Sequence, residues 1–191
     1  MWLRKYKPVI WTGVSTGHHL MPDYLGVILR NFLSSLFVVL LFVSTSFAGG
    51  RDARYPVGPN ESMTPGSVCK NPTRYRYPEK VAYCERDVQS MLKRSVIEDY
   101  DRKLGYRIES MDRQAFKIDH YIPLCMGGSN ERDNLWPQHK SVYEQTDLLE
   151  QVLCEKMAQG VLRQVQAIDL IKDAKNHLEK SEEILAYAQG L

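Results

Sequence analysis

Apolar residues recur at helical spacing in three segments of the chain. The first segment predicts a helix that Asp87 caps and that Gly105 stops. Its buried face should carry Val88, Met91, Leu92 and Val96. The second segment predicts a helix from Ser141 to Gly160, because Ser141 to Glu144 fits the capping-box pattern. Its buried face should carry Leu149, Val152, Leu153 and Met157.

The third helical segment lies near the end of the chain and turns polar beyond it. Its apolar positions at helical spacing are Val161, Val165, Ile168 and Ile171. Charged residues follow between Lys180 and Glu183. We therefore expect a final helix and then a charged helical tail over residues 176–191.

Two short segments between these helices have the pattern of strands. Phe116 to His120 alternates apolar and polar residues, and Asn134-Leu135-Trp136 forms a second short run that Pro137 should break. Gly127-Gly128-Ser129-Asn130 between them is a strong turn signal. Residues 49–80 are rich in proline and glycine and lack periodicity, which predicts an irregular arm. The pattern indicates one α+β domain over residues 81–175.

The first 48 residues differ from the rest. A basic beginning leads into an apolar run from Leu36 to Val43, which is too short to span a bilayer comfortably. Small residues before Gly49, at Ser46 and Ala48, fit a cleavage site. We interpret residues 1–48 as a signal peptide, with an uncleaved anchor as the alternative. We therefore expect the protein to be exported to the periplasm or the medium, and the mature chain to have no stable membrane association after cleavage.

The true start of this leader is a separate question. Met21 would be a more ordinary start, because it leaves a short leader with a basic residue just ahead of the apolar run. Residues 1–20 are therefore given no functional weight.

Removal of the leader changes the charge balance but leaves all four cysteines in the chain. Residues 49–191 hold 21 basic and 22 acidic residues, so overall charge is no argument for nucleic-acid binding. Residues 49–117 nevertheless hold 14 basic against 10 acidic residues, which favours phosphate contacts in the first half. All four cysteines lie in the mature part, and an even count in an exported chain favours disulfides. Three pairings are open, and a zinc site is the alternative.

One segment resembles a known family. Asp119-His120-Tyr121-Ile122-Pro123-Leu124, Gly127-Gly128 and Asn134-Leu135-Trp136-Pro137, in this order, resemble the motif of HNH endonucleases, in the branch found in small exported bacterial proteins. The resemblance covers residues 81–172. It implies a ββα-metal (His-Me finger) core, a hairpin and a helix, with additional helices on both sides. It also implies a phosphodiester hydrolase.

The resemblance assigns roles to individual residues. His120 is expected to be the general base that activates water, and Asp119 a metal ligand. Asn134 is expected to fix the hairpin and to orient the His120 ring through hydrogen bonds. The third position of the family motif falls on Tyr143, a poor ligand for a hard cation. We therefore expect His139 to be the second ligand of a divalent metal, with Mg²⁺ or Mn²⁺ favoured.

Basic and aromatic side chains are the candidates for substrate contacts. Lys140, Arg113 and Trp136 are candidates for binding nucleic acid, although solvated charges and a buried tryptophan are the simpler interpretations. Further candidates for phosphate contacts are Arg74, Arg76, Lys93 and Arg94.

We therefore expect cleavage of DNA, and of RNA as a second substrate, with little sequence specificity. Two alternatives stay open. One is a nucleic-acid-binding module of the same fold that has lost turnover. The other is a structural envelope protein that uses its charged terminal helix.

Overall fold

The fold described here is that of residues 54–191 in a computed structural model, so the predicted signal peptide lies outside the described residues. Strands and helices follow one another as β1 (Arg74–Arg76), β2 (Val81–Tyr83), α2 (Ser90–Leu104), β3 (Phe116–His120), β4 (Leu135–His139), α3 (Lys140–Ala158), α4 (Gln164–Asn176) and α5 (Ser181–Gly190). Helices and two small antiparallel hairpins confirm the α+β class. Among these residues no helix has the length and apolar content to cross a membrane.

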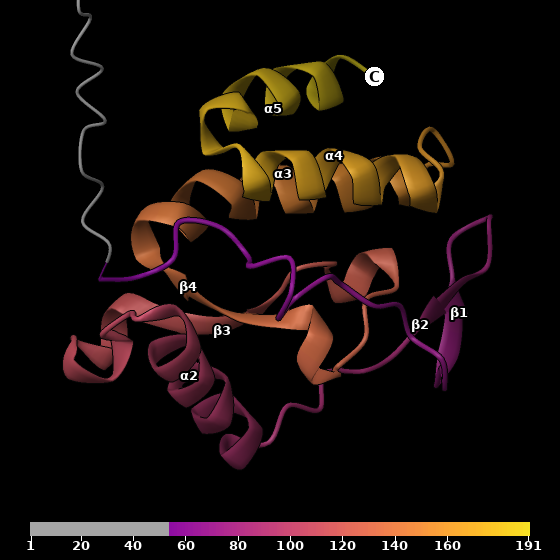
Figure 1. Ribbon diagram of the computed structural model, residues 1–191. Coiled ribbons are helices and arrows are strands. Elements are labelled where there is room, and N and C mark those ends of the chain that lie inside the picture. The colour runs from indigo at the N-terminus through magenta and orange to yellow at the C-terminus, as the bar shows by residue number, and fades with distance from the viewer. Residues whose placement is uncertain (1–53) are drawn as a thin grey trace, which may run out of the picture. The chain divides into compact units, whose positions relative to one another are not determined.

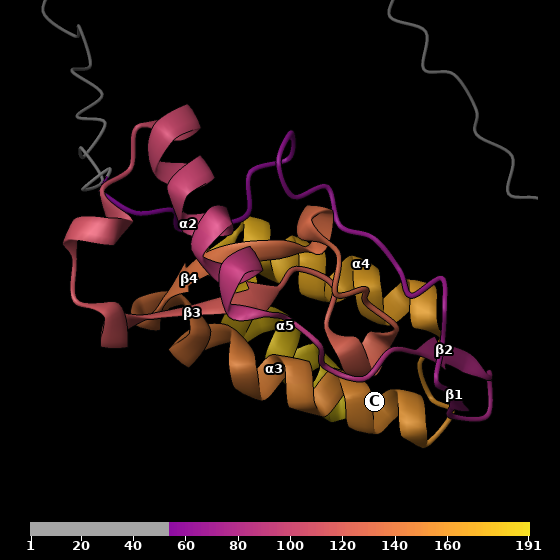
Figure 2. The same ribbon diagram turned by 90° about the horizontal axis from the view of Figure 1, so that it is seen from below.

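The hairpin of β3 and β4 lies between helices. Its strands run antiparallel and pair Phe116 with His139 at one end and His120 with Leu135 at the other. Figure 1 shows α2 on one side of this hairpin and α3 and α4 on the other, with α5 beyond them. Figure 2 shows the same elements from the α2 side. Because helices cover both faces, successive residues of β3 are buried, including Asp119 and His120.

Two apolar clusters form the core on either side of the hairpin. One joins α2 to the strands and contains Tyr100, Trp136 and Val142. The other joins α3, α4 and α5 and contains Leu149 and Ile171. Burial of these side chains contributes roughly 1.5–3 kcal/mol each, which holds the helices on the hairpin.

Helix α2 begins later than its sequence pattern predicted. Gln89, and not Asp87, occupies the N-cap, while the end at Gly105 is as expected, with Gly105 in the left-handed conformation at φ 76°. Met91 is 81% exposed, so its assignment to the buried face was wrong. The residues of α2 that face the core are Val96, which was expected there, and Ile97 and Tyr100.

The start of α3 and the end of β4 also differ from expectation. The helix begins at Lys140, and the Nδ1 atom of His139 accepts a hydrogen bond from the Ser141 N–H as its cap. Pro137 lies inside β4 and pairs with Ile118. In the described part of the chain β4 has β3 as its one partner, so a missing N–H on the outer edge costs no ladder bond.

The C-terminal segment is part of the core, in contrast to the expected charged tail. It contains helix α5, whose Ile184 and Ala188 are buried against α3 and α4. In α4 the buried positions are shifted from those expected. Val165 is 60% exposed, whereas Ala167 is fully buried.

A second hairpin and one of two disulfides organise the segment expected to be an irregular arm. Strands β1 and β2 pair in the register Arg74 with Tyr83. Disulfides join Cys69 to Cys84 and Cys125 to Cys154, which confirms disulfides and selects one of three possible pairings. The first closes the base of the β1–β2 hairpin, and the second joins the loop after β3 to α3.

Candidate functional site

The loop from Tyr121 to Asn134 fixes the geometry at the end of β3. The Asn134 side chain is fully buried, and its Oδ1 atom accepts a hydrogen bond from the Ile122 N–H at 2.8 Å. Its Nδ2 atom donates to the carbonyl oxygens of Ile122 and Ser129, both at 2.9 Å. A Cβ atom on Gly128 would lie 1.8 Å from the Ile122 carbonyl oxygen, so only glycine fits there. The Asn134 amide and Gly128 thus hold the loop closed beside His120.

The His120 ring lies beneath two side chains from other segments. Its Nε2 atom lies 3.1 Å from Oδ1 of Asn130, and its Nδ1 atom 3.4 Å from Nη1 of Arg86. Arg86 also donates to the Ile118 carbonyl oxygen at 2.9 Å. His120 is 3% exposed, and this burial lowers its pKa to about 4, with the Arg86 charge acting in the same direction. The imidazole is therefore neutral at physiological pH.

Orientation of the ring comes from Asn130, not from Asn134 as the family resemblance implied. The Nδ2 atom of Asn130 donates to the Glu85 carbonyl oxygen at 2.6 Å, which fixes the amide with its oxygen toward His120. The hydrogen bonds of Asn134 go to the loop backbone instead. Asn134 therefore has the expected role in the hairpin, while Asn130 contacts the ring.

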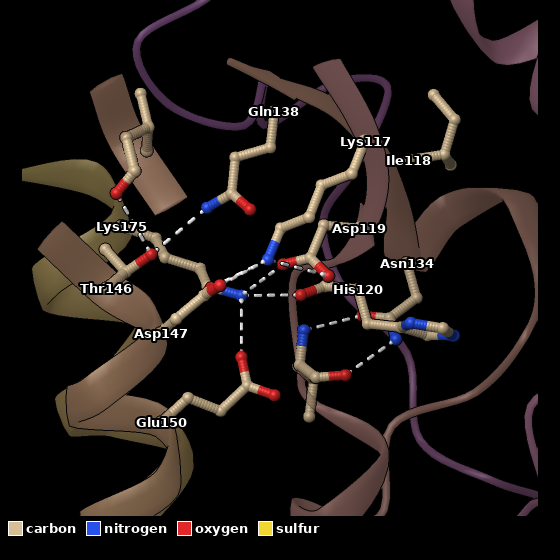
Figure 3. A network of polar contacts seen from close by, with 12 residues as sticks. Lys117, Ile118, Asp119, His120, Asn134, Gln138, Thr146, Asp147, Glu150 and Lys175 are labelled. Atoms are coloured by element: carbon tan, nitrogen blue, oxygen red, sulfur yellow. Dashed lines mark hydrogen bonds and ion pairs between the residues drawn. The ribbon is translucent and has the colours of Figure 1, made fainter. Parts of the chain in front are cut away.

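Asp119 lies on the opposite side of β3, in a cluster of charges with Lys175 (Figure 3). The Lys175 ammonium is fully buried and lies 3.3 Å from Oδ2 of Asp119 and 3.6 Å from Oε2 of Glu150. It also donates to the His120 carbonyl oxygen at 2.6 Å. Burial alone would lower the Lys175 pKa, but the two carboxylates outweigh it and raise that pKa. Lys175 is therefore a permanent charge beneath β3.

The carboxylates of this cluster respond in opposite ways. Burial would raise the Asp119 pKa, but Lys175 and Lys117 outweigh it and hold that pKa below its usual value. For Glu150 burial prevails over the Lys175 charge, and its pKa is raised. Asp119 is therefore the ionised partner of Lys175.

A second lysine links Asp119 to helix α3. Lys117 Nζ donates to both oxygens of Asp147, at 2.7 and 2.9 Å, and lies 3.9 Å from Oδ1 of Asp119 (Figure 3). Lys117, Asp147 and Glu150 line a cavity of about 460 Å³ beside α3. A buried carboxylate from β3 and an exposed one from α3 thus face one partly exposed ammonium.

His139, the expected second metal ligand, lies away from Asp119, so that assignment was wrong. It pairs with Phe116, three residues along β3 from Asp119, which is roughly 10 Å at strand rise. Its ring stacks on Tyr55 with centroids 4.0 Å apart, and its Nδ1 atom caps α3. Across residues 54–191 no group of three or more His, Cys, Asp or Glu side chains is arranged to hold a metal ion.

The expected nucleic-acid contacts do not gather at His120 either. Lys140 begins α3, and Arg113 donates to the Phe116 carbonyl oxygen at 2.7 Å, so both lie toward the other end of the hairpin. Trp136 is fully buried and cannot stack on a base, which makes that assignment wrong.

The four further basic candidates fall into two groups. Arg74 and Arg76 lie on β1. Lys93 and Arg94 line a cavity of about 310 Å³ beside α2, together with Arg113.

Several residues of this site were missed by the sequence analysis: Arg86, Asn130, Lys117, Asp147, Glu150 and Lys175. A signal existed for Lys175, because it follows Ile171 by four residues on the buried stripe of α4, where a charge is unexpected. Asp147 lies one turn after Tyr143 and shares its helix face. Arg86 and Asn130 meet His120 through tertiary contacts that no local pattern encodes.

Comparison with known proteins adds no assignment: no protein-family model, no curated protein and no solved structure matches the chain.

Proposed function

We propose that this protein is an exported, metal-dependent HNH endonuclease that hydrolyses DNA, and RNA as a second substrate, with little sequence specificity. The order strand, loop, strand and helix in β3, β4 and α3 supports the ββα-metal class, because His120 ends the first strand and α3 directly follows the second. Two disulfides support export to an oxidising compartment such as the periplasm or the medium.

The observation that carries the proposal is the 3.1 Å contact of His120 Nε2 with Asn130 Oδ1, from which we infer the tautomer of the ring. Asn130 donates its amide N–H to the Glu85 carbonyl oxygen, so its Oδ1 atom is available to accept the proton of Nε2. A neutral imidazole with its proton on Nε2 has a lone pair on Nδ1. Nδ1 is therefore the nitrogen that can take a proton from water.

The proposed reaction uses this nitrogen as the base. Water attacks phosphorus and gives its proton to Nδ1 of His120, the bond from phosphorus to the leaving sugar oxygen breaks, and solvent protonates that oxygen. Asn130 Oδ1 stabilises the imidazolium that forms. Arg86 covers the ring in the absence of substrate. Rotation of its exposed side chain toward the phosphate both binds the anion and uncovers Nδ1.

Asp119 and Asp147 are the residues that would hold Mg²⁺ or Mn²⁺. Both carboxylates face the Lys117 ammonium, so a cation already stands between them, and hard oxygen donors suit these metals. When bound, the metal would supply positive charge that attracts the phosphate backbone from the Asp119 side of β3, opposite the His120 ring. Lys117 must first leave Asp147, which its 34% side-chain exposure allows.

Metal binding by this pair can be tested without catalysis. Lys117→Met should bind Mn²⁺ about threefold or more tightly than the unsubstituted protein, because the competing ammonium is gone. Isothermal titration calorimetry measures the affinity. Lys140→Met removes an equal charge at the start of α3 and should leave the affinity unchanged. Equal or weaker binding by the Lys117 variant would contradict the assignment of Asp119 and Asp147.

A nucleic-acid-binding module without turnover is the second candidate. It is favoured by the burial of the His120 ring and by the two ammonium groups that already neutralise Asp119. Such a protein would bind nucleic acid and leave it intact.

Plasmid nicking separates the two candidates. The purified mature chain should nick supercoiled DNA with Mg²⁺ or Mn²⁺, should stop with a chelator, and should lose at least about a hundredfold of its rate as His120→Ala. A circular dichroism spectrum of that variant checks that it folds. Absence of cation-dependent nicking would leave the binding module as the better proposal.

A further inference from the structure

We propose that the β1–β2 hairpin and its flanks, Lys70–Arg86, hold the substrate as single-stranded nucleic acid beside His120. This inference rests on the proposed nuclease function, because it assigns a substrate form to the same site. The segment is called the basic hairpin below.

Charge distinguishes the basic hairpin from the rest of the described chain. It holds five basic and two acidic residues, whereas the other residues of 54–191 hold 15 basic and 19 acidic residues. Its basic residues are Lys70, Arg74, Arg76, Lys80 and Arg86. A local excess of cations on an otherwise acidic protein selects a polyanion for this surface.

The two strand arginines are held side by side. Arg74 and Arg76 lie on one face of β1, and their guanidinium carbons lie 4.7 and 4.6 Å from the centroid of the Tyr83 ring. Stacking on an aromatic ring orients a guanidinium and leaves its edge free to donate to phosphate oxygens. Arg74 also has a long ion pair with Glu85, at 3.7 Å, between side chains that are 57% and 64% exposed. Such an exposed pair yields readily to a phosphate.

An aromatic side chain on the other face of β1 provides a platform for a base. Tyr75 is 66% exposed, and strand alternation directs it away from the two arginines. Base stacking on an exposed ring contributes roughly 1–3 kcal/mol and needs an unpaired base. Arginines for the backbone and a tyrosine for a base therefore favour a single strand over a duplex.

The hairpin is anchored and leads directly to the catalytic base. Two three-residue strands are too short to be stable alone, and the Cys69–Cys84 disulfide closes them at their base. Two residues after Cys84, Arg86 reaches Nδ1 of His120. Figures 1 and 2 both show β1 and β2 at one edge of the part of the chain that residues 54–191 form. A strand held there runs toward His120.

Binding without turnover tests this proposal. The full chain carrying His120→Ala is titrated into labelled dT20 and into a labelled 20-base-pair duplex, followed by fluorescence anisotropy. Arg74→Gln with Arg76→Gln should weaken dT20 binding about tenfold and reduce the salt slope by about 1.4, at roughly 0.7 for each phosphate contact. Tyr75→Ala should weaken dT20 binding about fivefold or more and leave duplex binding unchanged.

A matched pair on helix α2 is the control. Lys93→Gln with Arg94→Gln removes the same charge beside the second group of basic residues and should leave dT20 affinity within about twofold. Thermal melting by circular dichroism checks that each variant folds. The proposal is overturned if the two α2 substitutions weaken dT20 binding more than the two β1 substitutions do, or if neither pair weakens it. It is also overturned if Tyr75→Ala weakens binding of dT20 and of the duplex equally.

Plasmid nicking by the unsubstituted chain, run in parallel, distinguishes this inference from the nuclease proposal. Nicking without any effect of the hairpin variants overturns the hairpin alone. Hairpin-dependent binding without nicking overturns the nuclease and leaves the hairpin as a binding surface.

Discussion

The chemistry available to His120 is set by a chain of three contacts. The Glu85 carbonyl oxygen orients the Asn130 amide, the amide orients the ring, and the ring then presents Nδ1 to Arg86. A histidine after a short alternating segment is visible in the sequence, but Asn130 is ten residues further along and Glu85 lies before α2. Only the folded loop brings Asn130 and Glu85 to His120. The sequence alone therefore could not predict which amide orients the ring.

Removal of the orienting amide should impair catalysis without removing the base. We expect Asn130→Ala to lower kcat roughly 10- to 100-fold with a small change in KM, because the ring loses its fixed tautomer. Nitrogen chemical shifts of the His120 ring, measured by NMR, should change from an Nε2-protonated form to a mixture. Gln114→Ala, at an exposed site in the turn before β3, is the control. Unchanged ring shifts in the Asn130 variant would exclude its positioning role.

Burial of His120 also makes stability depend on pH. Its pKa is about 4 in the folded protein against 6.5 for an unperturbed histidine, so protons bind the unfolded chain first as pH falls. The stabilisation is complete above pH 6.5 and is lost between pH 6.5 and 4, by up to about 3 kcal/mol. Urea unfolding at pH 7, 5.5 and 4.5 measures this loss. The difference in unfolding free energy between wild type and His120→Gln should shrink over that range. A constant difference would contradict the assignment of this loss to His120.

Sequence patterns located the main elements of the fold but not how they face the core. The strand over Phe116–His120 and the end of α2 at Gly105 were predicted as observed, because alternation and a C-terminal glycine are local signals. The exposed Met91 and the N-cap at His139 were not predicted, because tertiary packing decides which side of a helix is covered and where it starts. The short strand β1 has no periodicity to reveal it and depends on a disulfide.

Gly128, in the loop between β3 and β4, should be required for a stable β3–β4 hairpin. Gly128→Ala would bring a Cβ atom to 1.8 Å from the Ile122 carbonyl oxygen and 2.9 Å from the Asn134 amide nitrogen. The loop must shift, and we expect a loss of about 2–3 kcal/mol in unfolding free energy. Urea denaturation measures it. Gly190→Ala, where nothing lies within 4 Å, should cost nothing measurable, and equal stability of the two variants would mean that the loop adapts.

At the scale of the whole molecule, the two clusters of the core meet at β3. Asp119 faces Lys175 from α4, while the other face of the hairpin is covered by α2. A buried lysine that joins a carboxylate and a backbone carbonyl ties the C-terminal helices to the candidate site. Residues 176–191, which were expected to be a charged tail, are thus coupled through α4 to the strand that carries His120. Their removal would therefore disturb the core as well as the surface.

This coupling decides how a structural role of the C-terminal segment can be tested. Deletion of residues 181–191 would remove Ile184 and Ala188 from the core, so we expect a loss of about 3 kcal/mol or more and failure of nicking through unfolding. Urea denaturation of the truncated chain measures that loss, and an unchanged midpoint would show that α5 does not support the core. Because truncation unfolds the site, it cannot separate an envelope protein from a nuclease. Glu182→Gln with Glu183→Gln changes exposed charges alone and should leave both stability and nicking unaltered, whereas a protein that acts through this charged surface would lose its function.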